Sequence, residues 1–377
     1  MPQAMNPYVP GQPADPGSFA GRLELIRRVE VGIEEALKLR RSSALLLQGY
    51  RGSGKTSAIR KIQALAHEKL PGALTAEIQL RAQSSEEHLL ESIVKDVKRQ
   101  LAARRGAGER VKNWIERLNS VTIAGSGFTL GAKGGPATAQ GLTLWKSCVD
   151  ALEGAPLLVV CIDDAELLDT SGIGALKTIA ESHSEVPVIL VVAGGVELWD
   201  SLTRKDTSPI ARIFSGAMFD IGEFSPSETR DALEAPIAKI KGSGRWTSEG
   251  ASEVQALSHG YPYLVQCVAA AAYGDGISID AKQVRKTLPA ALKAGSSWLE
   301  RESIELSDED VRAFVKIASC GRPILRSSEI MNLGVQGPYI ARLARLKVLR
   351  KVSRGRYELR KAPAIAYYHA LRRGLTV

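Results

Sequence analysis

The sequence predicts an α/β fold: a parallel five-stranded sheet covered by helices, then an all-helical region, then a small C-terminal domain. Short apolar runs that suit buried strands alternate with helix-length amphipathic segments up to residue 221. This alternation is typical of a parallel sheet with crossover helices. Strand signals stop at Ser225, and the four segments that follow have helical spacing. The chain therefore combines an α/β core with two smaller, differently built parts.

The expected domain boundaries follow these changes of pattern. Pro and Gly are frequent in the first residues, which predicts an extended segment without regular structure. Three short helices and two basic β segments near the C-terminus predict a winged helix-turn-helix. The boundaries are 1–20 for the extended segment, 21–223 for the α/β core, 224–305 for a helical lid and 306–377 for the winged helix.

Composition favours an ordinary globular protein of two or three domains. The 377 residues are 44% hydrophobic and 24% charged, without an apolar run of membrane-spanning length or a signal peptide at the N-terminus. The four cysteines are scattered and lack C-x-x-C spacing, so they predict free thiols rather than a zinc site. We expect a cytoplasmic protein that does not act at a membrane.

Positive charge is concentrated at one end of the chain. Residues 306–377 hold 15 Lys and Arg against 5 Asp and Glu, whereas the rest of the chain is close to neutral. This asymmetry predicts a polyanionic partner for the C-terminal domain.

The strongest motif is G-Y-R-G-S-G-K-T at residues 49–56, between an apolar strand at 43–47 and a helix at 57–70. A glycine-rich turn before a helix directs backbone N–H groups and the positive end of the helix dipole at a phosphate. Lys55 is expected to reach the β- and γ-phosphates, and the Thr56 hydroxyl to bind Mg²⁺. The predicted nucleotide contacts are Gly49, Tyr50, Arg51, Gly52, Ser53, Gly54, Lys55, Thr56 and Ser57.

A fully apolar strand at 156–162 ends in Asp163 and Asp164, which supply the second half of a nucleotide site. Asp163 is expected to hold Mg²⁺, and Asp164 to act as the base that orients the attacking water. An Asp pair that only caps a helix is the alternative. The other core strands are expected at 73–80, 186–192 and 218–221, and a hairpin is expected at 121–130.

Together these motifs resemble an AAA+ ATPase of the initiator-like (origin-recognition-like) or STAND-like group. The resemblance covers about residues 6–275. Its residues are Asn6-Pro7-Tyr8, Phe19-Ala20-Gly21-Arg22, the 49–56 and 162–168 motifs, Phe224, and His259 to Leu264. It implies ATP or ADP with Mg²⁺ as ligands, and it implies that Tyr8 and Val9 border the adenine. It also implies self-association, with an arginine finger acting in trans. Arg212 is the first candidate for this finger and Arg204 the second, although either could be a solvated surface residue.

The sequence departs from this group at three places. Aspartate stands at 164 where glutamate is usual, and the strand at 186–192 ends in Ala193-Gly194-Gly195 without a polar sensor side chain. Tyr263 stands where relatives often have the arginine that senses the γ-phosphate. We therefore expect ATP binding with slow hydrolysis.

Residues 336–346 are expected to form the recognition helix of the winged domain. Duplex DNA would meet Tyr339, Arg342 and Arg345 in its major groove, and the phosphates would meet the wing residues Arg350, Lys351, Arg354 and Arg356. The combined prediction is an ATP-dependent switch that binds DNA. Two alternatives remain: a STAND-type signalling ATPase whose winged helix docks a protein partner, and a nucleotide-binding scaffold without hydrolysis.

Overall fold

The computed structural model divides the chain into two compact units, residues 22–222 and residues 1–21 with 223–377. The structure describes residues 6–103, 109–125, 137–181, 185–203, 210, 212–238, 240, 244–274, 276–301 and 305–375. None of the helices in these ranges has the length and apolar character needed to cross a membrane. All four cysteines are free thiols; Cys148, Cys161 and Cys267 are buried and Cys320 is partly exposed.

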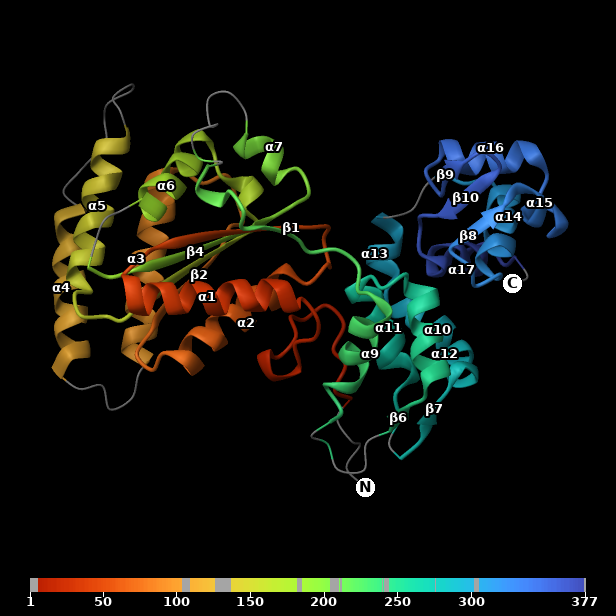
Figure 1. The fold of residues 1–377 in the computed structure, drawn as a ribbon, viewed down its shortest axis with the longest axis horizontal. Coiled ribbons are helices and arrows are strands. Elements are labelled where there is room, and N and C mark those ends of the chain that lie inside the picture. Colours follow the sequence, from red (N-terminus) through yellow and green to blue (C-terminus); the bar gives the residue numbers. More distant parts are fainter. Residues whose placement is uncertain are drawn as a thin grey trace. The chain divides into compact units, whose positions relative to one another are not determined.

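The first unit is built on a parallel five-stranded sheet, as predicted (Figure 1). Its strand order is β2-β3-β4-β1-β5, so the first strand of the chain lies between the fourth and the fifth. The strands are β1 (Ser43–Gln48), β2 (Leu74–Gln79), β3 (Leu158–Asp163), β4 (Val188–Gly194) and β5 (Met218–Asp220). β3 and β4 are buried along their whole length, because helices cover both faces of the sheet.

Helices α1 (Leu23–Leu39) and α2 (Lys55–Lys69) contact each other and cover one face of the sheet. The other face packs against α3 (Glu86–Ala103), α5 (Ala137–Ala151) and α6 (Thr170–Glu181), and α4 (Glu109–Gly125) packs outside them (Figure 1). Short elements complete the unit: η2 (Ala165–Leu167), α7 (Leu198–Leu202) and η3 (Arg212–Phe214). This layering places the ends of β1, β3 and β4 beside one another at the carboxyl edge of the sheet.

The hairpin predicted at 121–130 is wrong in its first half. Residues 121–125 continue helix α4, whose Trp114 and Leu118 are buried in the core beside α5. The local β propensity of Val121-Thr122-Ile123 yields to the packing of the helix that contains it. Residues 126–130 lie outside the described ranges.

The second unit begins with the N-terminal segment, which includes η1 (Pro16–Ser18), and continues with a group of helices. These are α9 (Pro226–Glu234), α10 (Ser248–Ser258), α11 (Pro262–Ala272), α12 (Ala281–Ala294) and α13 (Ser296–Arg301). Two features differ from the prediction. The last of the four predicted helical segments is divided at Gly295 into α12 and α13. Two short parallel strands, β6 (Arg245–Trp246) and β7 (Ser278–Ile279), occur where only helices were expected.

The C-terminal part of this unit has the element order helix, strand, two helices, β-hairpin and helix. It consists of α14 (Asp308–Ala318), β8 (Ile324–Arg326), α15 (Ser327–Asn332), α16 (Gly337–Arg345), β9 (Leu349–Ser353), β10 (Arg356–Leu359) and α17 (Pro363–Arg372). The three strands pair antiparallel in the order β8-β10-β9. The three predicted helices and the two predicted strands are present, whereas β8 and α17 were not anticipated.

Candidate nucleotide-binding site

The loop between β1 and α2 has the backbone conformation that phosphate binding requires. Gly52 and Gly54 have positive φ angles of 82° and 99°, which only glycine adopts without strain. A Cβ on Gly49 would lie 2.2 Å from the carbonyl oxygen of Ile221 and 2.7 Å from Ser53 Oγ, so glycine is needed there too. The N-terminus of α2 begins at Lys55 directly behind the loop, where its first N–H groups lack helical acceptors.

Two side chains of the loop are suited to a phosphate. Lys55 Nζ donates hydrogen bonds to the carbonyls of Gly49 and Tyr50, at 2.8 and 3.1 Å, so the amine is folded back on the loop. Ser53 Oγ is buried without a hydrogen-bond partner among the described residues. A phosphate oxygen in the loop would supply that partner and would attract the lysine.

The loop and the acidic strand meet in a direct contact. Thr56 Oγ1, in the first turn of α2, donates a hydrogen bond to Asp163 Oδ2 at the end of β3, across 2.5 Å. The other oxygen of Asp163 accepts from the backbone N–H of Asp164 at 3.0 Å. A hydroxyl beside a carboxylate is a set of oxygen donors that suits Mg²⁺, whose remaining ligands are commonly phosphate and water. The pair therefore fits the predicted metal position.

Electrostatics at this contact favour a bound cation. Burial raises the pKa of Asp163 above its usual range, opposed by the hydrogen bond from Thr56. Burial lowers the pKa of Lys55, opposed by the nearby carboxylates of Asp163, Glu166 and Asp164. A divalent cation would favour the ionised form of Asp163 and offset the cost of burying it.

Comparison with known proteins agrees with this geometry. Residues 18–192 match the family described as the AAA ATPase domain. Over these residues the chain is similar to an AAA ATPase domain. No curated protein sequence matches the chain.

Solved structures resemble the chain over nearly its whole length. The ORC2 protein of Aeropyrum pernix, solved with ADPNP and ADP, has a TM-score of 0.51 at 14% identity, with 97% of each chain covered, and this likeness concerns the fold. Cdc6p of Pyrobaculum aerophilum gives a TM-score of 0.49 at 13% identity, covering 97% of this chain and 95% of that one. The A. pernix ORC1 protein in complex with DNA gives 0.44 at 16% identity, with 94% of each chain covered.

The first unit holds a third acidic residue to which the sequence analysis gave no role. Glu166, in η2, accepts a hydrogen bond through Oε2 from the backbone N–H of Gly195, at 3.0 Å. It stands three residues after Asp163 and therefore near the same edge of the sheet. The signal in the sequence was the acidic spacing D-D-x-E, although the hydrogen bond to Gly195 is a long-range contact that spacing does not reveal.

Asp164, the predicted base, has a left-handed backbone conformation with a φ of 57°. Aspartate and asparagine tolerate this region better than most other residues, but it still costs about 1 kcal/mol or more. This conformation turns the chain between β3 and η2. Asp164 is partly exposed, as a residue that contacts water must be.

Of the two predicted arginine fingers, Arg212 lies in the described part of the chain. Arg212 is exposed in η3, directly before β5. This position is compatible with a contact to another subunit, but it is equally that of a solvated arginine. Arg204 lies outside the described residues.

Tyr8, predicted to border the adenine, is 2% exposed and belongs to the core of the helical unit. Its hydroxyl donates to the carbonyl of Leu233 and accepts from Trp246 Nε1, the latter at 2.7 Å. Burial raises the pKa of the Tyr8 hydroxyl, so it stays protonated and donates. Its ring packs inside this unit, whereas Val9 is exposed, and the adenine contacts of both residues stay predictions.

Two of the predicted DNA contacts, Arg342 and Arg350, form ion pairs within the fold. Arg342 Nε lies 3.0 and 2.7 Å from the two carboxylate oxygens of Asp310, whose side chain is fully buried at the start of α14. Arg350 pairs with Glu358 on the adjacent strand of the wing, at 2.6 Å. Arg342 therefore neutralises a buried charge, and its contact with DNA stays a prediction.

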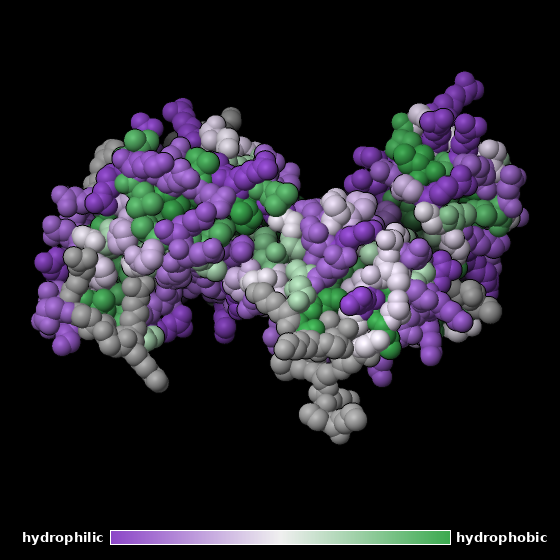
Figure 2. All heavy atoms as spheres, turned by 60° about the horizontal axis from the view of Figure 1, so that its bottom comes forward, coloured by the Kyte–Doolittle hydropathy of each residue, from purple (hydrophilic) through white to green (hydrophobic). Residues whose placement is uncertain are grey.

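The remaining predicted contacts are accessible. Tyr339 is partly exposed on α16. The other four are exposed and make no ion pair with any residue in the described ranges: Arg345, Lys351, Arg354 and Arg356. Hydrophilic side chains cover much of the C-terminal part in the view of Figure 2, where it lies at the right.

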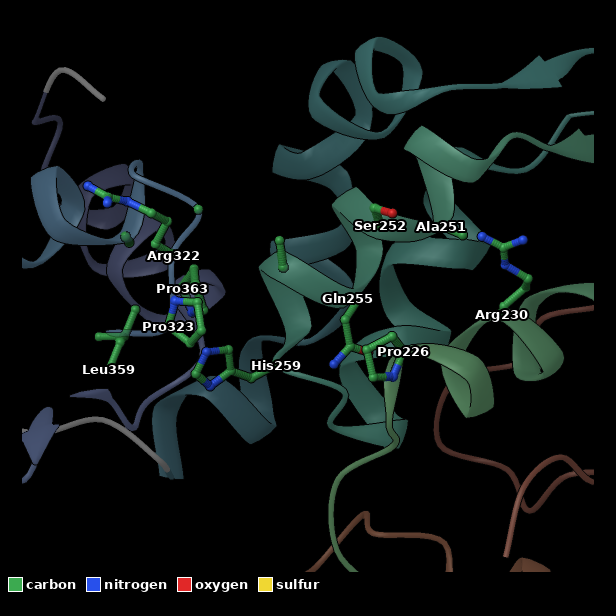
Figure 3. A pocket seen from close by; sticks show the side chains of 13 residues that line it. Pro226, Arg230, Ala251, Ser252, Gln255, His259, Arg322, Pro323, Leu359 and Pro363 are labelled. Atoms are coloured by element: carbon green, nitrogen blue, oxygen red, sulfur yellow. The ribbon is translucent and has the colours of Figure 1, made fainter. Parts of the chain in front are cut away.

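A pocket of about 520 Å³ lies within the second unit (Figure 3). Gln255 of α10 and His259 at the end of this helix line it opposite C-terminal residues that include Pro323 and Leu359. Burial lowers the pKa of His259, so its imidazole is neutral at pH 7. The pocket joins two parts of one unit and carries no convergent set of charged groups.

Proposed function

We propose that this chain is an ATP-binding molecular switch that hydrolyses ATP slowly and binds duplex DNA through a winged helix at residues 306–377. The observation that carries the nucleotide part is the hydrogen bond between Thr56 and Asp163. It joins the phosphate loop to the acidic strand in the way that a shared Mg²⁺ requires, and it accompanies a match to the AAA ATPase domain family.

Each residue of this site has a distinct part in the proposed reaction. The loop N–H groups and Lys55 bind and orient the β- and γ-phosphates, and Thr56 and Asp163 hold Mg²⁺, which neutralises phosphate charge when bound. Asp164 accepts a proton from the attacking water. Aspartate is one methylene shorter than glutamate, so this contact is less favourable and turnover is slow.

Support for DNA binding comes from charge and element order. The order of helices and strands from α14 to β10 is that of a winged helix, with α16 as its recognition helix. The excess of ten positive charges in residues 306–377 suits a polyanion. One of the similar solved structures is the A. pernix ORC1 protein in complex with DNA, and we extend DNA binding to this chain as part of the proposal.

A protein-docking function is the second candidate, and one observation favours it. Arg342 and Arg350, two of the cations best placed on α16 and the wing, are neutralised within the fold by Asp310 and Glu358. A winged helix of this kind could dock a protein partner in a STAND-type signalling ATPase. In that case the exposed cations would only solvate the surface.

One experiment separates these candidates. The combined variant Arg345→Ala, Lys351→Ala, Arg354→Ala and Arg356→Ala is compared with Lys286→Ala, which removes an exposed cation from helix α12. We expect the combined variant to lose duplex-DNA binding and keep its affinity for ATP, whereas Lys286→Ala leaves both unchanged. Unchanged DNA binding in the combined variant, or no DNA binding by the wild type, would refute the DNA part of the proposal.

A further inference from the structure

The end of strand β4 lies at the phosphate loop but has no polar side chain of its own. The carbonyl of Gly194 accepts a hydrogen bond from the backbone N–H of Gly49, the first residue of the loop, at 3.2 Å. The sequence here is Ala193-Gly194-Gly195. A functional group at this position would have to come from another segment.

Glu166 supplies such a group. Its Oε2 accepts from the N–H of Gly195 at 3.0 Å, so the carboxylate lies at the end of β4. A Cβ on Gly194 would stand 2.6 Å from the same oxygen. The absence of a side chain at 194 is therefore what makes room for the carboxylate of Glu166.

The rest of the carboxylate is open to a ligand. Glu166 is exposed, and its Oε1 has no hydrogen-bond partner in the part of the chain that the structure describes. Its charge also acts on Lys55, as one of three carboxylates that favour the protonated amine. Glu166 is thus held at one oxygen, free at the other, and close enough to the phosphate-binding lysine to affect it.

We infer that Glu166 is a catalytic residue of this ATPase, which takes the place of a polar side chain at the end of β4 and accepts a hydrogen bond from the attacking water. The inference rests on the proposed ATP hydrolysis. In that reaction the water oxygen forms a bond to the γ-phosphorus, and the bond from this phosphorus to the β,γ-bridging oxygen breaks. Asp164 takes the proton, while Glu166 fixes the orientation of the water through Oε1.

A purely structural role is the competing explanation, in which Glu166 only fixes the turn between β4 and α7. Glu166→Gln distinguishes the two roles. The amide oxygen of glutamine still accepts from the N–H of Gly195, but the charge is lost, and the NH2 group that replaces Oε1 cannot accept a hydrogen bond from the water. Glu197→Gln is the matched control, because it removes one exposed charge in the same loop without touching Gly195 through its side chain.

The test measures steady-state ATP turnover and the affinity for a fluorescent ATP analogue in wild type, Glu166→Gln, Glu166→Ala and Glu197→Gln. We expect kcat to fall by about 10²-fold in both Glu166 variants, with affinity kept within about threefold and Glu197→Gln unchanged. If Glu166→Gln turned over ATP as fast as the wild type and only Glu166→Ala were slower, the inference would be overturned and the proposed function would stand. Loss of affinity together with turnover would likewise mark a structural role. A wild type that binds ATP but does not hydrolyse it would overturn both.

Discussion

Thr56 Oγ1 and Asp163 Oδ2 lie 2.5 Å apart, so a hydroxyl from the start of α2 donates a hydrogen bond to a carboxylate at the end of β3. Threonine and aspartate here come from segments more than 100 residues apart in the chain, and they meet because β1 and β3 both flank β4 in the sheet. The contact holds together two motifs that separately predict phosphate and metal binding.

Removing the Thr56 hydroxyl is expected to weaken Mg²⁺-dependent binding. Thr56→Ala should lower the affinity for ATP in the presence of Mg²⁺ by about tenfold or more, because an oxygen ligand is lost. Thr56→Ser keeps the hydroxyl and should bind nearly as wild type. Titration of a fluorescent ATP analogue with Mg²⁺ and with a chelator measures the difference. Equal affinity of the alanine and serine variants would show that this hydroxyl does not hold the metal.

Replacing Asp164 by asparagine is expected to separate binding from turnover. Asparagine tolerates the left-handed backbone at 164 but cannot take a proton from water, so kcat should fall by about 10²-fold with little change in affinity. A single-turnover assay with radiolabelled ATP measures slow rates reliably. Turnover equal to wild type would assign the base role to another group.

Arg342→Ala is expected to lower the free energy of unfolding of the protein, because Arg342 pairs with a buried carboxylate. The variant leaves the fully buried carboxylate of Asp310 with only the hydrogen bonds from the N–H and the hydroxyl of Ser307. The Arg342 side chain is 44% exposed, so we expect a loss of about 2 kcal/mol, below the cost of breaking a fully buried pair. Urea unfolding followed by circular dichroism measures it, and Arg312→Ala, on the exposed side of α14, is the control. Equal stability of the two variants would contradict the structural role of Arg342.

The same pair should show a defined dependence on pH. Burial alone would raise the pKa of Asp310, but hydrogen bonds from Ser307 and the charge of Arg342 hold it below the ordinary value. A group with a lowered folded pKa stabilises the protein fully above its unfolded pKa, about 4, and loses that contribution as the pH falls through the folded pKa. The difference in the free energy of unfolding between wild type and Arg342→Ala should therefore be constant from about pH 5 to about pH 7, where the carboxylate is ionised in both states. It should shrink below about pH 4. A difference that grows on acidification would contradict this assignment.

The local motifs were predictable from the sequence, because each depends on neighbouring residues. The strand, glycine loop and helix around Lys55 follow from apolar runs and from positive φ angles that only glycine adopts easily. The acidic end of β3 was equally visible. The order of the strands in the sheet, by contrast, was not predicted, because the alternation of strands and helices indicates only that the sheet is parallel.

Long-range pairings were not predictable. Nothing local indicates that Arg342 pairs with Asp310, 32 residues earlier, or that Glu166 reaches Gly195, 29 residues later. Spacing on α16 places Arg342 on its polar face, which a DNA contact and an ion pair satisfy equally well. Similarly, the β propensity of residues 121–123 was overridden by the packing of α4 against α5.

The measurement that tests the central claim most directly is duplex-DNA binding by the full chain over a salt series, with ATP and Mg²⁺, with ADP, and without nucleotide. The account predicts binding that weakens steeply as salt rises, since each phosphate contact releases about one counterion, with an affinity that differs between the nucleotide states. Absence of DNA binding in all three states, with ATP still bound, would contradict a DNA-directed switch and leave protein docking as the function of residues 306–377.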